Sequence, residues 1–355
     1  MVTIFITLGG NSMKKVNAII TASFSEKGLN DLNEFLNIEY HNWLEQKRPY
    51  SQEEINKMVQ GKEILIMETE ELSRKTIEAN PQLKVIACCR GLRGDDMTVD
   101  IPACSELKIP VLLAPGRNLN AVAEFTIFLT LAIMRKIHPA IKWFYDGNWQ
   151  EWLDFIAFRS CEIKGRTVGL MGFGNIGKRV SKLFNAFEAK VIAYDPFIND
   201  LAVFKQYNVE KVDAETLFKT ADIVSLHMNV NEETKGFINK KLIGLMKPTA
   251  FLINTARAAL IERDTLYTAL KDKKIAGYAT DVYHQEPCNP NSEPMLLLDN
   301  VLGTPHLGGT SYEVIANHSE MIVNDLNKLL NGEKPQFIIN PEVLPEFYEI
   351  LKTMK

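Results

Sequence analysis

The chain has 355 residues, an apolar content of 46% and a formal net charge of −4. This length predicts about two domains, and the mixed charge gives no electrostatic reason to expect binding to nucleic acid or membranes. No apolar run reaches the length of a membrane-spanning helix. The five cysteines form no C-x-x-C pair, which favours reduced thiols and a cytoplasmic location.

The first residues are expected to precede the folded chain. Residues 1–12 contain a short apolar run with no basic segment before it, whereas Met13 leads directly into the first expected strand. We therefore interpret residues 1–12 as an upstream extension or a misassigned start.

The first third of the chain alternates expected strands and helices. Continuous apolar runs predict buried parallel strands at 16–22, 63–67, 83–89 and 110–113. Ser51 and Glu54 have the spacing of a capping box at a helix start. Because this α/β unit contains no glycine fingerprint, we do not expect a nucleotide site in it.

A long helix is predicted from Asn120 to about Ile137, and its mostly apolar surface should be buried on more than one side. Residues 143–158 follow with three tryptophans among acidic residues, which indicates an extended arm. The aromatic residues of this arm either pack locally or form a dimer interface. Both interpretations stay open here, and we expect the protein to be a homodimer.

The strongest motif lies in the middle of the chain. Gly172, Gly174 and Gly177 have the spacing G-x-G-x-x-G between an expected strand and helix, and Asp195 ends the next apolar run, eighteen residues after Gly177. This combination predicts a dinucleotide site, with the pyrophosphate at the helix N-terminus. Asp195 can accept hydrogen bonds from ribose hydroxyls and would repel a 2′-phosphate, so NAD is expected rather than NADP.

The second half of the chain predicts a doubly wound parallel sheet. Its six expected strands are 167–171, 190–194, 222–227, 250–254, 275–279 and 300–303. A helix at about 311–330 should pack back on the first third. The expected fold is thus α/β with two Rossmann-like domains: a doubly wound NAD domain of residues 119–307, inserted into a smaller, discontinuous, flavodoxin-like substrate domain of residues 1–118 and 308–355.

Three titratable residues follow the ends of expected strands: Arg257, Glu286 and His306. Hydride transfer to a 2-keto acid needs a cation that holds the carboxylate and polarises the carbonyl, and an acid that protonates the developing alkoxide. It also needs a carboxylate that orients this acid. Each residue alone is compatible with a surface or loop role, but together, at the carboxyl end of a nucleotide-binding sheet, they favour an active site.

These motifs resemble those of the NAD-dependent D-2-hydroxyacid dehydrogenase family, which includes D-3-phosphoglycerate dehydrogenase. The resemblance extends from Met13 to about Leu330 and rests on residues 115–126, the glycine loop with Asp195, and residues 221–227, 254–257, 281–287 and 304–306. It implies that Arg257 binds the substrate, that His306 exchanges the proton, and that Glu286 is the partner of His306. It also implies a cofactor set that includes Asp281, near the nicotinamide carboxamide, and Val122, Asn175, Ile176, His227, Thr255 and Ala256. The implied substrate-binding set, besides Arg257, is Gly91, Leu92, Arg93 and Asn118.

The sequence departs from the family's pattern in three places. Ala258 stands where the family usually has Gly, and Met228-Asn229 stand where an apolar-Pro pair is common. The segment 90–96 is rich in arginine. Arg90, Arg93 and Arg117 either meet a second anionic group of the substrate, such as a phosphate or distal carboxylate, or are neutralised by Asp95 and Asp96.

We therefore expect an oxidoreductase that moves a hydride between NAD and a D-2-hydroxy acid, such as 3-phosphoglycerate, hydroxypyruvate or a sugar-derived acid. An NAD-sensing dimeric regulator on the same fold is the alternative, which the complete Arg–Glu–His set disfavours. Formate oxidation is disfavoured because Glu286 stands where those relatives are expected to carry Gln. Tyr283 and His284 are expected to shape the site, Cys88 and Cys89 to belong to the core, and no cluster has metal-ligand spacing.

Overall fold

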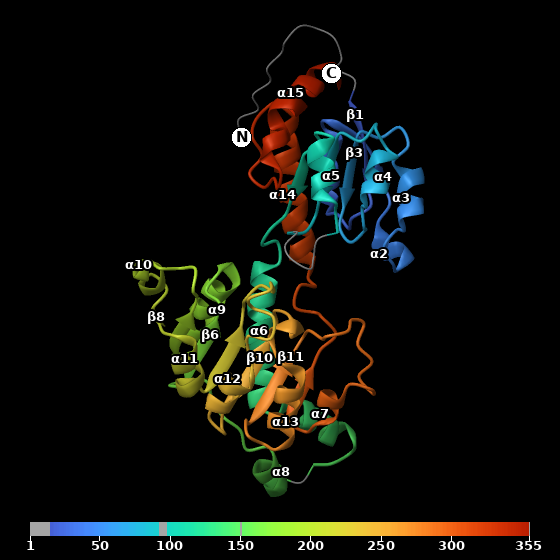
Figure 1. Ribbon diagram of the computed structural model, residues 1–355. Coiled ribbons are helices and arrows are strands. Elements are labelled where there is room, and N and C mark those ends of the chain that lie inside the picture. The colour runs from blue at the N-terminus through green and yellow to red at the C-terminus, as the bar shows by residue number, and fades with distance from the viewer. Residues whose placement is uncertain (1–14, 92–97, 150, 355) are drawn as a thin grey trace. The chain divides into compact units, whose positions relative to one another are not determined.

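A computed structural model describes residues 15–91, 98–149 and 151–354 of the chain. The chain divides into two compact units (Figure 1). Unit 1 contains the described residues up to Arg117 together with those from Tyr312 onward, and unit 2 is Asn118–Ser311. Residues 1–12, which we interpreted as an extension, and the arginine-rich residues 92–97 lie outside the described part of the chain.

Unit 1 is built on a parallel sheet whose strands have the order β2-β1-β3-β4-β5. This is the flavodoxin-like doubly wound order. Four of the strands match predicted apolar runs, whereas the edge strand β2 was not predicted. The strands are β1 (Val16–Ile20), β2 (Leu36–Tyr40), β3 (Ile64–Met67), β4 (Val85–Cys88) and β5 (Val111–Leu113).

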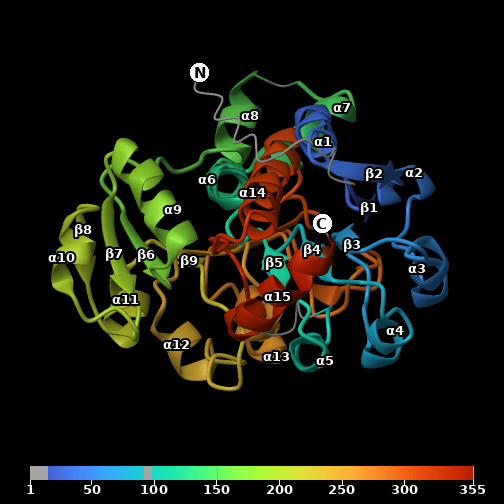
Figure 2. The same cartoon turned by 90° about the horizontal axis from the view of Figure 1, so that it is seen from above.

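Alternation along these strands divides the apolar side chains between two faces of the sheet. Ala18 and Ile20 pack in one core with residues of α1 (Glu26–Asn33), α14 (Tyr312–Leu330) and α15 (Leu344–Met354). Ile19 packs in the other core with residues of α3 (Gln52–Met58), α4 (Arg74–Glu78) and α5 (Ile101–Glu106). Helices α1 and α14 lie side by side (Figure 2), so the C-terminal part of the chain completes this unit. The short α2 (Trp43–Gln46) follows β2.

Two local predictions for unit 1 are confirmed. Ser51 and Glu54 form the capping box of α3. Cys88 and Cys89 are fully buried in the two cores, and burial raises the pKa of the Cys88 thiol to about 11. A buried thiol of this kind is a poor nucleophile.

Unit 2 is built on a larger parallel sheet of order β12-β11-β10-β9-β6-β7-β8. The order reverses between β6 and β9, which is where sheets of this kind bind ligands. All six predicted strands are present, and the short edge strand β8 was missed. The strands are β6 (Thr167–Met171), β7 (Lys190–Tyr194), β8 (Val209–Lys211), β9 (Ile223–Leu226), β10 (Phe251–Asn254), β11 (Gly277–Thr280) and β12 (Val301–Gly303).

Helices cover both faces of this sheet. Residues of α6 (Leu119–Met134), α9 (Asn175–Ala186) and α10 (Leu201–Lys205) pack on one face, and those of α11 (Ala214–Thr220), α12 (Lys240–Leu245) and α13 (Arg263–Lys271) pack on the other. As predicted, α6 is buried on more than one side, because it contacts α9 as well as strands β10, β11 and β12. In the described part of the chain, no helix combines the length and apolar character that crossing a membrane requires.

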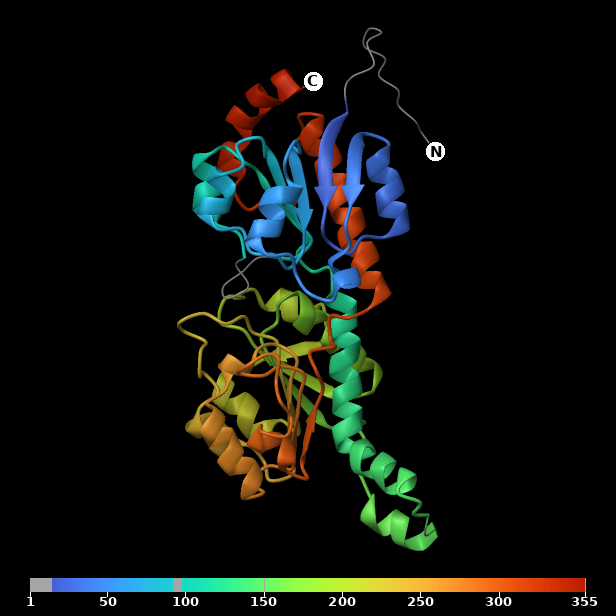
Figure 3. The ribbon, with the colours of Figure 1, turned by 90° about the vertical axis from the view of Figure 1, so that its right-hand side faces the viewer.

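The predicted arm is a pair of helices that continues from α6, α7 (Ile137–Tyr145) and α8 (Glu151–Ala157), and in Figure 3 it runs away from the sheet of unit 2. Some of its rings contact one another, as Phe144 and Trp149 do at a centroid distance of 5.8 Å. The arm nevertheless exposes a group of large apolar side chains, which comprises Ile141, Phe144, Tyr145, Trp149, Trp152, Leu153 and Ile156. Local packing alone does not cover these side chains.

Candidate active site

The glycine loop joins β6 to α9 in unit 2. Gly172 has a φ of +94°, and a Cβ there would lie 2.7 Å from the carbonyl oxygen of His227, so both backbone conformation and space require glycine. A Cβ on Gly177 would clash with the carbonyl oxygen of Gly172, so Gly177 allows α9 to approach the strand. Gly174 differs, because a Cβ there would meet nothing within 4 Å.

The N-terminus of α9 has no side-chain cap. Gly174 is the N-cap residue and is exposed, and the helix begins with Asn175 and Ile176. The first N–H groups of the helix therefore face open space and carry the positive end of the helix dipole. An uncapped helix N-terminus with open space around its N-cap glycine is suited to a phosphate group.

Asp195 directly follows β7 and is 8% exposed. Its Oδ2 accepts a hydrogen bond from the Phe173 N–H at 2.9 Å, and its Oδ1 accepts one from the Phe197 N–H at 3.0 Å. The carboxylate thus ties the glycine loop to the turn after β7. It also lines an open hollow together with Tyr194, Pro196, Lys211, Val212, Asp213 and Thr216.

His227 follows β9 and stays neutral. Burial lowers the pKa of its imidazole to about 3, and its Nε2 lies 2.9 Å from the hydroxyl of Ser225. The backbone of His227 is the surface against which Gly172 packs. His227 therefore adds no positive charge beside the glycine loop.

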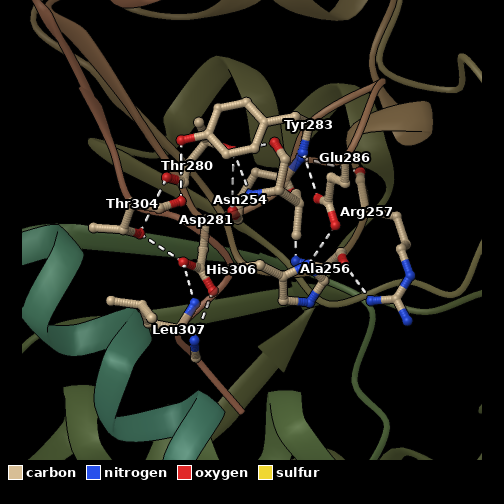
Figure 4. A network of polar contacts seen from close by, with 12 residues as sticks. Asn254, Ala256, Arg257, Thr280, Asp281, Tyr283, Glu286, Thr304, His306 and Leu307 are labelled. Atoms are coloured by element: carbon tan, nitrogen blue, oxygen red, sulfur yellow. Dashed lines mark hydrogen bonds and ion pairs between the residues drawn. The ribbon is translucent and has the colours of Figure 1, made fainter. Parts of the chain in front are cut away.

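His306 and Glu286 form a direct pair beyond the ends of β12 and β11 (Figure 4). Nδ1 of His306 lies 2.6 Å from Oε2 of Glu286, and the other oxygen, Oε1, accepts a hydrogen bond from the Tyr283 N–H at 2.8 Å. With Nδ1–H donated to the carboxylate, Nε2 is the ring nitrogen that can exchange a proton with a substrate. Both side chains are partly exposed, 47% for His306 and 36% for Glu286.

Asp281 fixes the backbone of the loop that carries His306. It is 2% exposed, and its Oδ1 accepts hydrogen bonds from the Thr304 hydroxyl at 2.6 Å and from the Leu307 N–H at 2.8 Å. Its Oδ2 accepts one from the Gly308 N–H at 2.7 Å. These contacts enclose His306, whose φ of +54° is unusual for a residue other than glycine.

Arg257 lies in the loop after β10, at the same edge of the sheet. The buried Asn254 shapes this loop, since its side chain accepts from the Ala256 N–H at 3.0 Å and donates to the Arg257 carbonyl at 3.0 Å. The guanidinium of Arg257 donates to the Ala256 carbonyl at 2.7 Å and points away from the imidazole (Figure 4). Thr255 hydrogen-bonds Thr126 of α6 at 2.8 Å. The three predicted catalytic residues therefore follow the neighbouring strands β10, β11 and β12.

The other predicted residues are spread over both units. Val122 is buried in the first turn of α6, and Asn118 precedes that helix beside Gly309. Gly91 follows β4 in unit 1 and packs on Pro115, while Leu92 and Arg93 lie outside the described residues.

A second polar network in unit 1 was not predicted. Nη1 of Arg117 lies 2.5 Å from Oε1 of Glu68 and 2.7 Å from Nδ1 of His318, and Nε2 of His318 lies 2.7 Å from the Ser23 carbonyl oxygen. Trp43 donates to the other carboxylate oxygen of Glu68 at 3.0 Å. Arg117 is therefore paired with the carboxylate of Glu68 within unit 1, whereas Asp95 and Asp96 lie outside the described residues.

Burial and charge set the protonation of this network. Burial, assisted by the charge of Arg117, lowers the pKa of His318 to about 4, so the ring is neutral and accepts from Arg117. Burial raises the pKa of Glu68, but Arg117 and the hydrogen bond from Trp43 outweigh burial and bring it below its ordinary value. The one sequence signal was Glu68, an acidic residue directly after a buried strand.

Comparisons with known proteins agree with this geometry. Residues 127–308 match the family model of the NAD-binding domain of D-isomer specific 2-hydroxyacid dehydrogenases. The chain is 36% identical over 333 residues to a putative 2-hydroxyacid dehydrogenase, YoaD of Bacillus subtilis, covering 91% of this chain and 94% of that protein. The chain belongs to this family. As an NAD-dependent dehydrogenase, it transfers a hydride between NAD(H) and a 2-hydroxy or 2-keto acid.

Two further similarities cover nearly the whole dehydrogenase. A glyoxylate reductase of Thermofilum pendens is 34% identical over 343 residues, which is 94% of this chain and 96% of that protein. The crystal structure of the TT0316 protein from Thermus thermophilus has a TM-score of 0.78 at 30% identity, covering 91% of this chain and all of that one.

Proposed function

We propose that this dehydrogenase reduces a small 2-keto acid of the glyoxylate and hydroxypyruvate type to the D-2-hydroxy acid, with His306 as the proton donor. The observation that carries the proposal is the 2.6 Å contact of His306 with Glu286 at the carboxyl edge of the unit 2 sheet. A histidine held by a carboxylate in a partly exposed position is suited to repeated proton exchange.

The cofactor is assigned to the glycine loop of unit 2. The open space at Gly174 and the uncapped start of α9, at Asn175, Ile176 and Gly177, fit a pyrophosphate. Asp195 in the adjacent hollow fits the adenosine ribose, since each of its oxygens has accepting capacity beyond the one hydrogen bond it makes. Bound NADH supplies the hydride for carbon 2 of the keto acid.

His306 delivers the proton. Its Nε2–H donates to the carbonyl oxygen of the keto acid and protonates the alkoxide as the C2–H bond forms. The proton on Nδ1 stays on the ring and donates to Glu286 throughout, so the imidazole keeps its orientation. The ring is neutral after Nε2 has given up its proton. In the oxidative direction the same nitrogen takes the proton from the hydroxyl group.

Arg257 binds the carboxylate and the carbonyl oxygen of the substrate. A guanidinium offers two parallel donors to a carboxylate and is always charged, so it holds the acid in one orientation and polarises the carbonyl. Asn254 fixes the loop on which Arg257 stands. The substitution of the family's usual Gly by Ala258 leaves this loop intact, because Ala258 is buried in the following 3-10 turn, η2 (Ala258–Leu260).

The remaining cofactor residues are also part of the proposal. Val122, Thr255, Ala256 and His227 border the same edge of the unit 2 sheet, and we assign them to the cofactor. For Asp281 we propose a contact to the nicotinamide carboxamide in addition to its hold on the His306 loop.

We propose a substrate domain of residues 1–118 and 308–355 and an NAD domain of residues 119–307, which differ from units 1 and 2 only in the assignment of residues 118 and 308–311. Substrate contacts from the substrate domain are assigned to Gly91, Leu92, Arg93 and Asn118, and those from the NAD domain to Arg257. A small keto acid is favoured over a phosphorylated one because Arg117, one of the three arginines suited to a second anion, is neutralised by Glu68. The similarity to a glyoxylate reductase supports the same substrate class.

We also propose that the protein is a cytoplasmic homodimer. The exposed apolar side chains of α7 and α8 support the dimer, since a surface of this kind is stabilised by a partner. The five cysteines are free thiols, which supports a reducing compartment.

NADH oxidation measured against a panel of 2-keto acids tests the function. We expect the highest kcat/KM for glyoxylate or hydroxypyruvate and at least tenfold less for phosphohydroxypyruvate, with pyruvate and sugar-derived 2-keto acids as further comparisons. A preference for the phosphorylated acid would contradict the proposed substrate class. NADH binding without turnover of any acid would instead favour an NAD-sensing regulator.

A further inference from the structure

Tyr283 contacts both Glu286 and the loop that presents His306. Its N–H donates to Oε1 of Glu286 at 2.8 Å, and its hydroxyl donates to the carbonyl oxygen of Thr304 at 3.0 Å. Thr304 belongs to the loop that ends in His306, so one residue holds both the carboxylate and the segment that presents the imidazole (Figure 4).

The Thr304 carbonyl is the acceptor that turns the chain toward His306. The N–H of His306 also donates to this oxygen, at 3.0 Å, which closes a three-residue turn around Pro305. Two donors therefore fix one carbonyl, and one of these donors is the backbone of His306 itself. Since His306 has a φ of +54°, the direction of its side chain depends on how this turn is held.

The hydroxyl group of Tyr283 is a permanent donor in this position. Burial raises the pKa of Tyr283 well above its ordinary value, so the phenol is protonated and can donate at neutral pH. The neighbouring backbone also makes room for it, because a Cβ at Gly303 would lie 2.5 Å from the Tyr283 oxygen. A phenylalanine would fill the same space but leave the Thr304 carbonyl with the His306 N–H alone.

Asp281 secures the other side of the same loop. Its carboxylate accepts from the Thr304 hydroxyl and from the N–H groups of Leu307 and Gly308. An ionised carboxylate has no proton to donate, so it cannot hold the Thr304 carbonyl or the carboxylate of Glu286. Asp281 therefore fixes where the loop lies, whereas Tyr283 is the residue that connects the loop to the carboxylate.

We propose that Tyr283 is a positioning residue that keeps the imidazole of His306 and the carboxylate of Glu286 aligned for proton transfer. The inference rests on the proposed function of that pair. Tyr283 itself exchanges no proton and acts only through the Thr304 carbonyl and the Glu286 carboxylate.

The decisive variant is Tyr283→Phe, which removes one hydroxyl and keeps the ring and the backbone N–H. We expect kcat to fall about three- to tenfold, the effect of one lost hydrogen bond. The KM for the keto acid and the Kd for NADH should stay within about twofold, and the solvent deuterium isotope effect on kcat should rise because proton transfer becomes slower. The control is Tyr348→Phe, which removes a similar hydroxyl-to-carbonyl bond, to Glu333 at 2.7 Å in unit 1, and should leave all four quantities unchanged.

A double-mutant cycle with Glu286→Gln separates positioning from a general structural effect. If Tyr283 acts through the pair, the loss caused by Tyr283→Phe should shrink to less than about twofold in the Glu286→Gln background. An equal loss in both backgrounds, or a wild-type kcat for Tyr283→Phe, would overturn the inference.

His306→Ala, measured beside these variants, separates this inference from the proposed function. Retained turnover in His306→Ala contradicts the proposed function and the inference with it. Lost turnover in His306→Ala together with a wild-type Tyr283→Phe contradicts the inference alone.

Discussion

Each of the two units holds a histidine near a carboxylate at the carboxyl edge of its parallel sheet, and the two histidines have opposite environments. In unit 2, His306 contacts Glu286 directly, and both side chains are partly exposed. In unit 1, His318 is fully buried, and Arg117 stands between it and Glu68. The same residue types therefore form a pair open to solvent in one unit and a closed network in the other.

The difference in solvent access indicates that the two histidines have different roles, one in proton exchange and one in stability. A proton can reach or leave His306 without exposing or burying an unpaired charge. A proton on His318 would place a second positive charge beside Arg117 in a buried position, and this is costly. We infer that the exposed pair serves turnover and that the buried network stabilises unit 1.

The largest effect is expected for His306→Ala. Loss of the proton donor should lower kcat by about a thousandfold or more, while the Kd for NADH, measured by fluorescence titration, changes less than about twofold. The control is His41→Ala, which breaks an exposed histidine–carboxylate contact in unit 1, to Glu39 at 2.8 Å, and should leave kcat unchanged. Equal activities of the two variants would contradict the catalytic role of His306.

The variant Arg117→Met tests whether the buried network stabilises unit 1. Removing the cation leaves Glu68 buried without a counter-charge, and we expect the free energy of unfolding of unit 1 to fall by about 3 kcal/mol in urea titrations. The matched change Arg48→Met breaks the exposed pair with Glu54, whose two contacts are each 2.8 Å, and should cost less than about 1 kcal/mol. A similar loss of unfolding free energy for both substitutions would show that burial does not increase the contribution of the Arg117 network to stability.

The pH dependence of stability should come from the buried histidine. Because the pKa of His318 is about 4 in the folded state and near 6.5 when unfolded, the unfolded chain binds more protons between these values. Its contribution, about 3 kcal/mol, is therefore complete above pH 6.5 and is lost as the pH falls toward 4. His318→Gln keeps an acceptor for Arg117 and a donor for Ser23 without a titration, so its unfolding free energy should vary less over this range. If the unfolding free energy of His318→Gln varies with pH as it does in the wild type, other groups cause the loss of stability in acid.

The smallest effect is expected at the glycine loop. Gly174→Ala adds a methyl group where a Cβ meets nothing within 4 Å, so stability should be unaffected while the Kd for NADH rises about tenfold. Gly244→Ala in α12 is the control, since a Cβ there also meets nothing, and it should leave NADH binding unchanged. Equal NADH affinities in the two variants would mean that the open space at Gly174 is not used by the cofactor.

Much of the fold follows from local pattern. The central strands are continuous apolar runs because both of their faces are covered by helices, and all of these strands were predicted. The two strands that were missed, β2 and β8, each lie at one edge of their sheet. β2 alternates buried and exposed residues, and β8 has only three residues, so neither shows a continuous apolar run.

The site was predictable to a different extent in each unit. Gly172, Glu286 and His306 stand in short motifs directly after strands, so the sequence places them at one edge of a sheet. His318 lies within the helical pattern of α14, and its partners Arg117 and Glu68 are about 200 and 250 residues away along the chain. Such a network depends on the tertiary structure, and no spacing in the sequence indicates it.

The interrupted course of unit 1 bears on how the protein is made. Its first core contains Ile322 and Leu326 of α14 and Phe347 of α15 together with the strands that are synthesised first. These strands must wait while the ribosome adds Asn118–Ser311, the whole of unit 2. At roughly 5–20 residues per second, that delay is on the order of ten seconds or more, during which unit 2 can fold and the nascent unit 1 keeps apolar surface open to chaperones.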